Sequence, residues 1–158
     1  YTQSTDRPSD TYGSKEETAM VQMIIGKKGK GKTKQLLDKV NTSIKTANGN
    51  IVYIDKSSKH MLELNNKIRL IDASGYGLKN SDEFIGFILG IISQDHDLEE
   101  MYLDSFLKVA NLEGQDLTDA LTQLNQISEQ FKVDFCISVS VEEKDLPDFA
   151  KEQVIISC

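Results

Sequence analysis

The chain has 158 residues, a formal net charge of -7 and 39% hydrophobic residues. This length suits one domain that can bury a core of its own. The negative charge argues against a general nucleic-acid binder, because affinity for phosphate backbones comes mostly from lysine and arginine. The longest apolar run, positions 84–92, is shorter than the ~20 residues that cross a bilayer, so no membrane span is expected.

Residues 1–19 are polar and rich in Ser, Thr and Asp, so they bury little apolar surface by themselves. The composition changes sharply at Met20, which predicts a leader over 1–19 and one domain over 20–158. We interpret the leader as a remnant added before a natural start at Met20, and a genuine extension is the alternative. The two cysteines show no disulfide spacing, which is typical of a reducing compartment and predicts a cytoplasmic protein.

Extended and helical patterns alternate from Met20 onward. Apolar runs predict strands over 20–26, 51–55, 67–72, 101–106, 133–141 and 153–157. Helical spacing predicts helices over 32–45, 82–93 and 117–131, with Ser81 as the N-cap of the second and a short acidic helix broken near Pro147. Strands that are apolar throughout and alternate with helices predict an α/β fold with a mostly parallel sheet flanked by helices.

The segment Gly26–Thr33 reads GKKGKGKT and matches the pattern G-x-x-x-x-G-K-[ST] between a predicted strand and a predicted helix. Glycines let the backbone curl so that successive N–H groups point at phosphate oxygens, and the helix that follows adds its positive end. Lys32 is expected to reach the β- and γ-phosphates, and the hydroxyl of Thr33 to bind Mg²⁺. The expected nucleotide-binding residues are Gly26, Lys27, Lys28, Gly29, Lys30, Gly31, Lys32, Thr33 and Lys34.

These residues resemble the phosphate-binding loop of P-loop nucleoside triphosphatases. The likeness is specific over about 20–45 and looser elsewhere. The chain from Met20 to Cys158 is also similar to small bacterial P-loop proteins loosely labelled twitching-motility-ATPase-like. The resemblance implies a P-loop domain with a RecA-like core that binds ATP and Mg²⁺.

Asp104 follows the apolar segment MYL and is the expected second metal contact. It resembles the Walker B aspartate of the RecA-like group, in which a strand and a helix separate that aspartate from the phosphate-loop helix. Lys32 and Asp104 are then the expected catalytic residues, and Thr33 and Asp104 the metal site. The alternative is a strand-end aspartate that caps the next turn. Asp55 and Asp72 also follow apolar runs.

Two features also resemble the partitioning ATPases. Asp72 begins a D-x-x-G segment, and the loop is similar to the deviant form G-K-G-G-x-G-K-T, in which Lys27 would reach across a dimer. The departure at Lys28 and the short spacing from Asp55 to Ile68 rank this likeness second. We interpret Asp72 as a turn residue.

Residues for hydrolysis are harder to find. RecA-like enzymes polarise the attacking water with a glutamate beside the Walker B aspartate or after the second strand, but here Ser105 and Lys56 stand at those positions. Glu63 lies farther along, and Arg69 is the one arginine after the leader. We therefore expect weak or partner-dependent ATP hydrolysis. The rivals are a nucleotide-sensing scaffold without turnover and a small-molecule kinase, although an arginine-rich lid is missing.

Lysines crowd the loop beyond what its motif requires. For Lys27, Lys28 and Lys30 we hypothesise that they raise affinity for a polyanionic nucleotide or that one of them crosses a dimer interface. Solvated loop side chains are the alternative. Ser138 or Ser140 is expected at a position that senses the γ-phosphate, and an ordinary strand-end serine is the alternative. The expected partners are a nucleotide and either a second copy or another protein.

Overall fold

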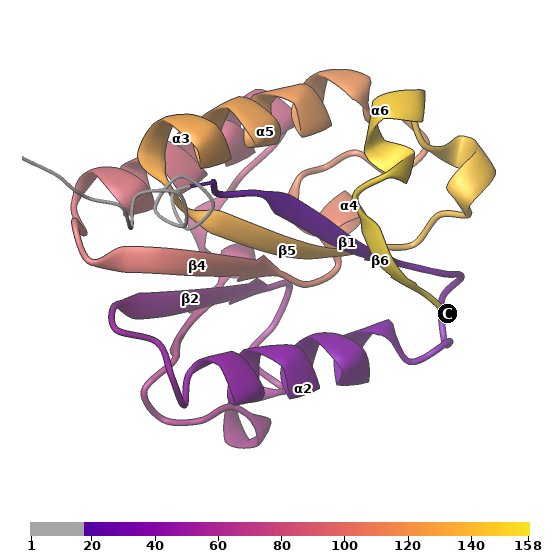
Figure 1. Ribbon diagram of the computed structural model, residues 1–158. Helices are drawn as coiled ribbons and strands as arrows, with labels where there is room; N and C mark the ends of the chain where they lie inside the picture. The colour runs from indigo at the N-terminus through magenta and orange to yellow at the C-terminus, as the bar shows by residue number, and fades with distance from the viewer. Residues whose placement is uncertain (1–17) are drawn as a thin grey trace, which may run out of the picture.

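The computed structural model describes residues 18–158, which build a six-stranded sheet covered by helices on both faces (Figure 1). Every strand pair is parallel, and the order across the sheet is β3-β2-β4-β5-β1-β6. The strands are β1 (Val21–Ile25), β2 (Asn50–Asp55), β3 (Arg69–Asp72), β4 (Leu98–Leu103), β5 (Asp134–Val139) and β6 (Val154–Ser157). The α/β class and the flanked sheet are confirmed, and the sheet is parallel throughout.

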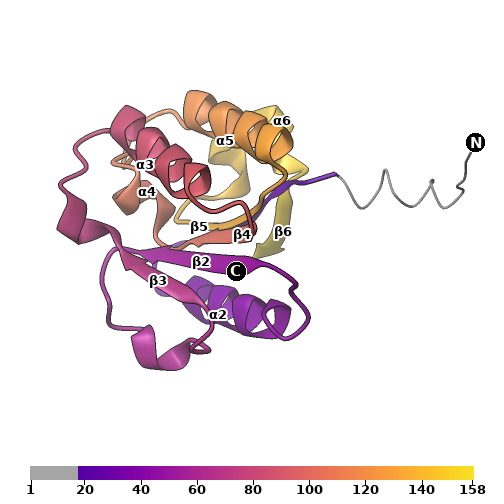
Figure 2. The same ribbon diagram turned by 90° about the vertical axis from the view of Figure 1, so that its left-hand side faces the viewer.

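The helices divide unequally between the two faces. Helix α2 (Lys32–Ser43) covers one face, and α3 (Ser81–Ser93) and α5 (Thr118–Phe131) cover the other (Figure 2). The short helices α4 (Phe106–Val109) and α6 (Asp148–Lys151) lie on the same side as α3 and α5. Three 3₁₀ turns complete the chain: η1 (Met61–Glu63), η2 (Ala73–Tyr76) and η3 (Glu143–Asp145).

Apolar side chains from both faces of the strands explain this layering. Leu36 and Val40 of α2 pack with Ile24 and Tyr53 in one buried cluster. On the opposite face, Phe84 of α3 belongs to a larger cluster that includes residues of α5 and inward-facing residues of β1, β4 and β5. A strand buried on both faces must be apolar at nearly every position, which is the pattern that predicted a covered parallel sheet.

Some boundaries differ from those predicted. Asn80, not Ser81, caps α3, because its side chain accepts a hydrogen bond from the backbone N–H of Glu83. Strand β4 begins earlier and ends at Leu103, so Asp104 lies just beyond it, and the unpredicted helix α4 begins at Phe106. Residues 1–17 of the predicted leader lie outside the described residues. Across residues 18–158, no helix has both the length and the apolar character that a membrane crossing requires.

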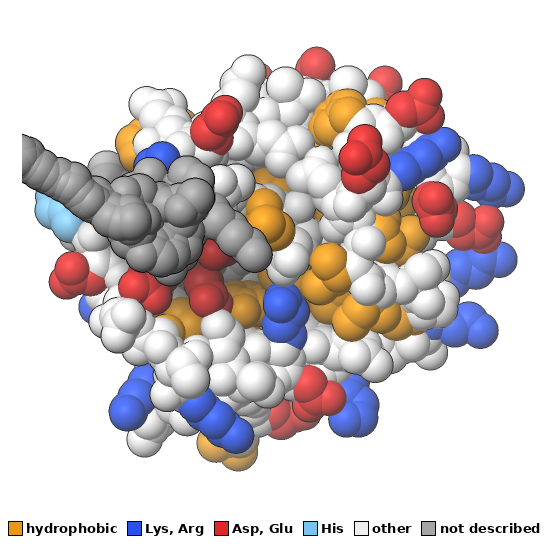
Figure 3. Space-filling model, viewed as in Figure 1, with side chains coloured by type: hydrophobic (Ala, Val, Ile, Leu, Met, Phe, Trp, Pro, Cys, Tyr) orange, Lys and Arg blue, Asp and Glu red, His pale blue; other side chains and the backbone are white. Residues whose placement is uncertain are grey.

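The loops that leave the sheet diverge at the carboxyl ends of neighbouring strands. The loop after β1 turns toward α2 on one face, whereas the chain after β4 and β5 turns toward the opposite face (Figure 1). In parallel α/β sheets, this divergence opens a crevice at the carboxyl edge, where ligands bind. Lysine and acidic side chains gather at this edge (Figure 3).

Candidate functional site

The loop between β1 and α2 has the backbone that the glycine pattern predicts. Gly29 and Gly31 have φ angles of 81° and 88°, a left-handed conformation that glycine adopts without steric cost. Gly31 is also the N-cap of α2 and, being glycine, has no side chain that could cap the helix. The first N–H groups of α2 at its positive end are therefore not capped from this position, which suits the binding of an anion.

Lys32 opens α2, and its ammonium group turns back over the loop. Its Nζ donates a hydrogen bond of 3.0 Å to the carbonyl oxygen of Lys27, and the residue is 9% exposed. Burial lowers the pKa of Lys32, the charges of Cys158 and Asp104 oppose this effect, and the charge of Lys28 adds to it. A buried cation whose hydrogen bond goes to an uncharged carbonyl gains from an anion beside it.

The parallel register sets three polar side chains level with one another along the carboxyl edge. Ile54 pairs with Leu103, and Leu103 pairs with Ile137. The residues that follow Ile54, Leu103 and Ile137 in the chain are Asp55, Asp104 and Ser138, so these three lie at the same level of the sheet. This alignment is a direct consequence of strand pairing, and it places residues far apart in sequence beside the loop after β1.

Asp104 is the centre of a hydrogen-bond network and is only 1% exposed. Its Oδ1 accepts from the hydroxyls of Thr33 at 3.2 Å and Ser138 at 2.6 Å, and from the backbone N–H of Ser105 at 2.9 Å. Its Oδ2 accepts from the buried hydroxyl of Tyr53 at 2.9 Å. The network holds the carboxylate of Asp104 next to Thr33, the residue that was predicted to share a metal with it.

Asp55 lies beside Asp104 but is sealed from solvent. It is 2% exposed, its Oδ1 accepts from the backbone N–H of Lys56 at 2.7 Å, and its Oδ2 has no partner among the described residues. Burial, and secondarily the charge of Asp104, raise the pKa of Asp55 above its ordinary value of 3.8. Asp55 is therefore a buried carboxylate next to the site, with one oxygen unpaired within the described part of the chain. It does not line the cavity.

The variant Asp55→Asn should be more stable than the wild type at neutral pH. Because the pKa is higher in the folded state, ionising Asp55 costs folding free energy above that pKa, and the cost disappears below 3.8, where both states are protonated. Removing a buried, half-unpaired charge should add about 1–3 kcal/mol at pH 7. Urea unfolding from pH 7 down to pH 4 should show the gain shrinking.

Asp38→Asn is the matched control, since Asp38 is exposed and pairs only with Lys34 at the surface. It should change stability by less than about 0.5 kcal/mol at either pH. A loss of stability in Asp55→Asn at pH 7 would show that the carboxylate has a charged partner and would contradict this description.

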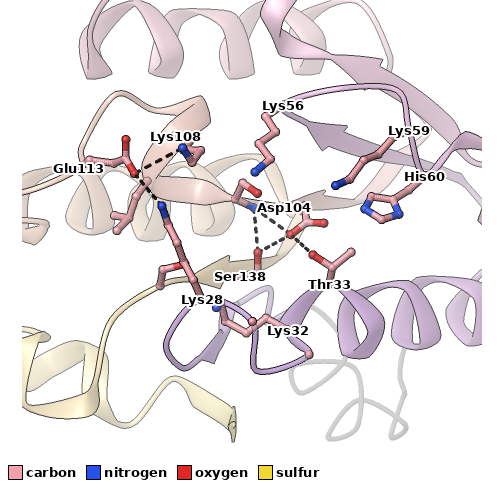
Figure 4. A pocket seen from close by; sticks show the side chains of 15 residues that line it. Lys28, Lys32, Thr33, Lys56, Lys59, His60, Asp104, Lys108, Glu113 and Ser138 are labelled. Carbon is pink, nitrogen blue, oxygen red and sulfur yellow. Dashed lines mark hydrogen bonds and ion pairs between the residues drawn. The ribbon is translucent and has the colours of Figure 1, made fainter.

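The network opens into a cavity of about 510 Å³ at the carboxyl edge (Figure 4). Five lysines line it, together with two carboxylates, those of Asp104 and Glu113. Lys28 and Lys108 converge on Glu113 at 3.9 and 3.8 Å. The amino groups of Lys56 and Lys59 point into the space above Asp104 and Thr33 (Figure 4). The lining lysines are Lys28, Lys32, Lys56, Lys59 and Lys108.

The cavity brings together part of the predicted set of nucleotide contacts. Lys28, Gly29, Gly31, Lys32 and Thr33 line it. Gly26, Lys27 and Lys30 line a separate hollow of about 310 Å³ near Ser157.

Lys34 lies on the helix surface, where it pairs with Asp38 at 3.2 Å. Two of the loop lysines have acidic neighbours: Lys27 pairs with Glu142 at 3.2 Å, and Lys28 lies 3.9 Å from Glu113.

The remaining candidates lie away from the cavity. Asp72 accepts hydrogen bonds from the N–H and hydroxyl of Ser74, as expected for a turn residue. Glu63 is exposed and lies 2.7 Å from the ring of His60. Arg69, the first residue of β3, pairs with Asp95 at 3.3 Å. None of Asp72, Glu63 and Arg69 is among the residues that line the cavity.

Sequence reasoning missed the lysines outside the loop. Lys56, Lys59 and Lys108 follow β2 and β4, and their place after strand ends was the available signal. Ser138 and Ser140 both line the cavity, and Ser138 is bonded to Asp104. A scan against models of protein families found no match. A search of curated proteins found no similar sequence.

Proposed function

We propose that the chain is a RecA-like P-loop domain that binds ATP with Mg²⁺ in the cavity beside the loop at 26–33. The observation that carries the proposal is the 3.2 Å hydrogen bond between Thr33 Oγ1 and Asp104 Oδ1, which joins residues 71 apart in sequence. A hydroxyl and a carboxylate are hard oxygen ligands that suit Mg²⁺. Their meeting beside a left-handed glycine loop and a buried lysine favours a metal-bound phosphate over an ordinary strand-end cap.

Different residues would bind the phosphates and the metal ion. Lys32 and the backbone N–H groups of the loop would hold phosphate oxygens, and Thr33 and Asp104 would hold Mg²⁺. The metal would neutralise part of the phosphate charge. Ser138 keeps the Asp104 carboxylate in position through its 2.6 Å hydrogen bond.

Turnover is proposed to be slow or dependent on a partner. A water-activating base needs a carboxylate that is free to accept a proton. Within the described cavity lining, both oxygens of Asp104 already accept hydrogen bonds, and Glu113 lies within ion-pair distance of two lysines. Single-turnover measurement of phosphate release, with and without cell extract, tests this part of the proposal. Release within seconds by the chain alone would contradict it.

Lys56 and Lys59 are proposed to contact the terminal phosphate. Neither has a carboxylate within ion-pair distance among residues 18–158, and both point into the cavity. The double variant Lys56→Gln/Lys59→Gln should weaken ATP binding about 10-fold or more, since a charged hydrogen bond contributes about 1.5–3 kcal/mol. ADP affinity should change less than about 3-fold. Displacement of a fluorescent ATP analogue by ATP and ADP measures both.

Lys67→Gln is the control, because Lys67 is an exposed lysine of the same connection that does not line the cavity. It should leave both affinities unchanged. Equal weakening of ATP and ADP in the double variant would instead place the two lysines on the inner phosphates.

A nucleotide-dependent dimer switch is the second candidate, and a specific observation favours it. The Lys27 side chain is 72% exposed, pairs with Glu142 at the surface and lines the outer hollow instead of the central cavity. It is therefore placed where a second copy could meet it. A dimer that forms only with a non-hydrolysable ATP analogue, detected by mass photometry, would favour the switch over the monomeric ATP-binding domain.

A further inference from the structure

We propose that the chain has a second ligand site, for a compact anion, next to the terminal phosphate of the bound nucleotide. The site is a smaller hollow of about 170 Å³ between η2 and α4. Lys56 and Lys108 line both this hollow and the main cavity, so the two spaces share a wall. The inference rests on the proposed nucleotide function, because it places the second ligand relative to the first.

The lining of the second hollow is suited to negative charge. Its two charged side chains are both cations, Lys56 and Lys108, and no described carboxylate lines it. Among residues 18–158, the ion-pair partner of Lys108 is Glu113 at 3.8 Å, with both side chains substantially exposed, and such pairs stabilise little. Lys56 has no ion-pair partner among residues 18–158, and the pair of Lys108 with Glu113 is exposed. Two such cations beside a concave, partly apolar space create a positive potential that attracts anions.

Polar groups frame the hollow and fix its shape. The side chain of Asn111 donates a hydrogen bond of 3.1 Å to the carbonyl oxygen of Leu78, which ties the end of α4 to the connection before α3. Ser74 lies on the opposite side, with its N–H and hydroxyl directed to Asp72. Leu78 and Val109 supply apolar surface between these polar residues. A few polar groups on an apolar wall are typical of small-molecule sites.

Size decides which ligand class fits. Small-molecule sites commonly have about 300–1,000 Å³, so the main cavity suits a nucleotide and the second hollow does not. A volume of 170 Å³ suits a compact molecule, since one water occupies about 30 Å³. The ligand is therefore a small carboxylate or phosphate compound.

The shared lysines explain how two anions can lie side by side. The main cavity has five lysines against two carboxylates, and Mg²⁺ would neutralise part of the triphosphate charge. Positive charge thus remains at the wall where Lys56 and Lys108 stand. Those ammonium groups would screen the repulsion between the terminal phosphate and the second anion.

The test is an NMR titration of the full chain saturated with Mg²⁺ and a non-hydrolysable ATP analogue, so that the terminal-phosphate position is already filled. Inorganic phosphate and succinate are added in separate arms at constant ionic strength. We expect saturable shifts of the backbone amides of Ser74, Gly77 and Asn111, with a dissociation constant of about 0.1–10 mM. The arm that binds more tightly identifies the anionic group.

Ser74→Glu is the decisive variant, because Ser74 is exposed and lines the second hollow but not the main cavity. The added carboxylate should weaken anion binding about 10-fold or more and leave the affinity for the ATP analogue unchanged. Ser93→Glu is the matched control at the far end of α3, and it should bind both ligands as the wild type does.

The outcomes separate the two proposals. If the ATP analogue binds but neither anion gives saturable shifts, or if Ser74→Glu binds the anion as tightly as the wild type, the second site is overturned and the nucleotide function stands. If the ATP analogue does not bind, the nucleotide function falls, and the anions are then titrated into the free chain. Absence of shifts at Ser74 in that case overturns the second site as well.

Discussion

Lys32→Ala should lower ATP affinity by about 100-fold or more. Lys32 is buried, opens α2 and holds its ammonium over the loop by a single bond to the Lys27 carbonyl. Alanine is the best helix former, and the lysine bonds only the loop carbonyl, so the fold should remain intact. The loss would come from removing a desolvated cation at the phosphates. Calorimetric titration with Mg·ATP measures it, and thermal unfolding checks the fold.

Lys34→Ala is the control for this prediction. Lys34 belongs to the same turn of α2, but it is exposed and pairs with Asp38. It should bind ATP within about 3-fold of the wild type. Equal losses in the two variants would mean that the lysines act only through general positive charge, and the specific role assigned to Lys32 would be wrong.

Asp104→Asn should remove the dependence of ATP binding on Mg²⁺. In the wild type, Mg²⁺ should tighten ATP binding about 10-fold or more, because Thr33 and Asp104 supply oxygen ligands and the metal separates the carboxylate from the phosphates. In Asp104→Asn, metal-free ATP should bind more tightly than it does to the wild type. Two unit charges 4 Å apart repel by about 1–4 kcal/mol in partly solvated surroundings.

Asparagine is chosen because it keeps the size of the side chain and one acceptor oxygen for Thr33 and Ser138. The hydroxyl of Tyr53, which donates to Oδ2 in the wild type, would instead accept from the new amide and lose the acceptor for its own hydrogen. Thermal unfolding of the variant therefore checks that the fold remains intact. Titrations with and without Mg²⁺ test the prediction. Unchanged tightening by Mg²⁺ in Asp104→Asn would exclude Asp104 as a metal contact.

The second hollow bears on the choice between rival functions. A phosphoryl-transfer enzyme needs a place for its acceptor beside the terminal phosphate, and the absence of an arginine-rich lid had weighed against a small-molecule kinase. Lys56 and Lys108 line both the main cavity and the second hollow. A compact anion bound there would lie next to the proposed terminal phosphate, which would favour transfer to an acceptor over simple hydrolysis.

The alternation of apolar runs predicted the sheet, and the glycine pattern predicted the loop, because both depend on local sequence. Thr33 and Asp104 were expected to share a metal because Asp104 resembles a Walker B aspartate. Their direct hydrogen bond follows from the meeting of the carboxyl ends of parallel strands at one edge of the sheet. The burial of Asp55 was not predictable, because it depends on how β2 pairs with β4. The lysines at positions 56, 59 and 108 lie on connections whose direction no periodic pattern encodes.

The residue that caps α3 could not be predicted from local sequence either. Asn80 and Ser81 are both good capping residues, and the structure uses Asn80 because its side chain reaches the N–H of Glu83. The division of the loop lysines between two hollows likewise depends on the backbone turns at Gly29 and Gly31.

The proposal that this chain binds a nucleoside triphosphate with Mg²⁺ is tested by calorimetric titration of the wild-type chain with ATP and with GTP, each in the presence and absence of Mg²⁺. We expect one site for Mg·ATP with a dissociation constant of about 1–100 μM, weaker binding of GTP, and weaker binding of ATP without the metal. Absence of binding by either nucleotide at about 1 mM would contradict it.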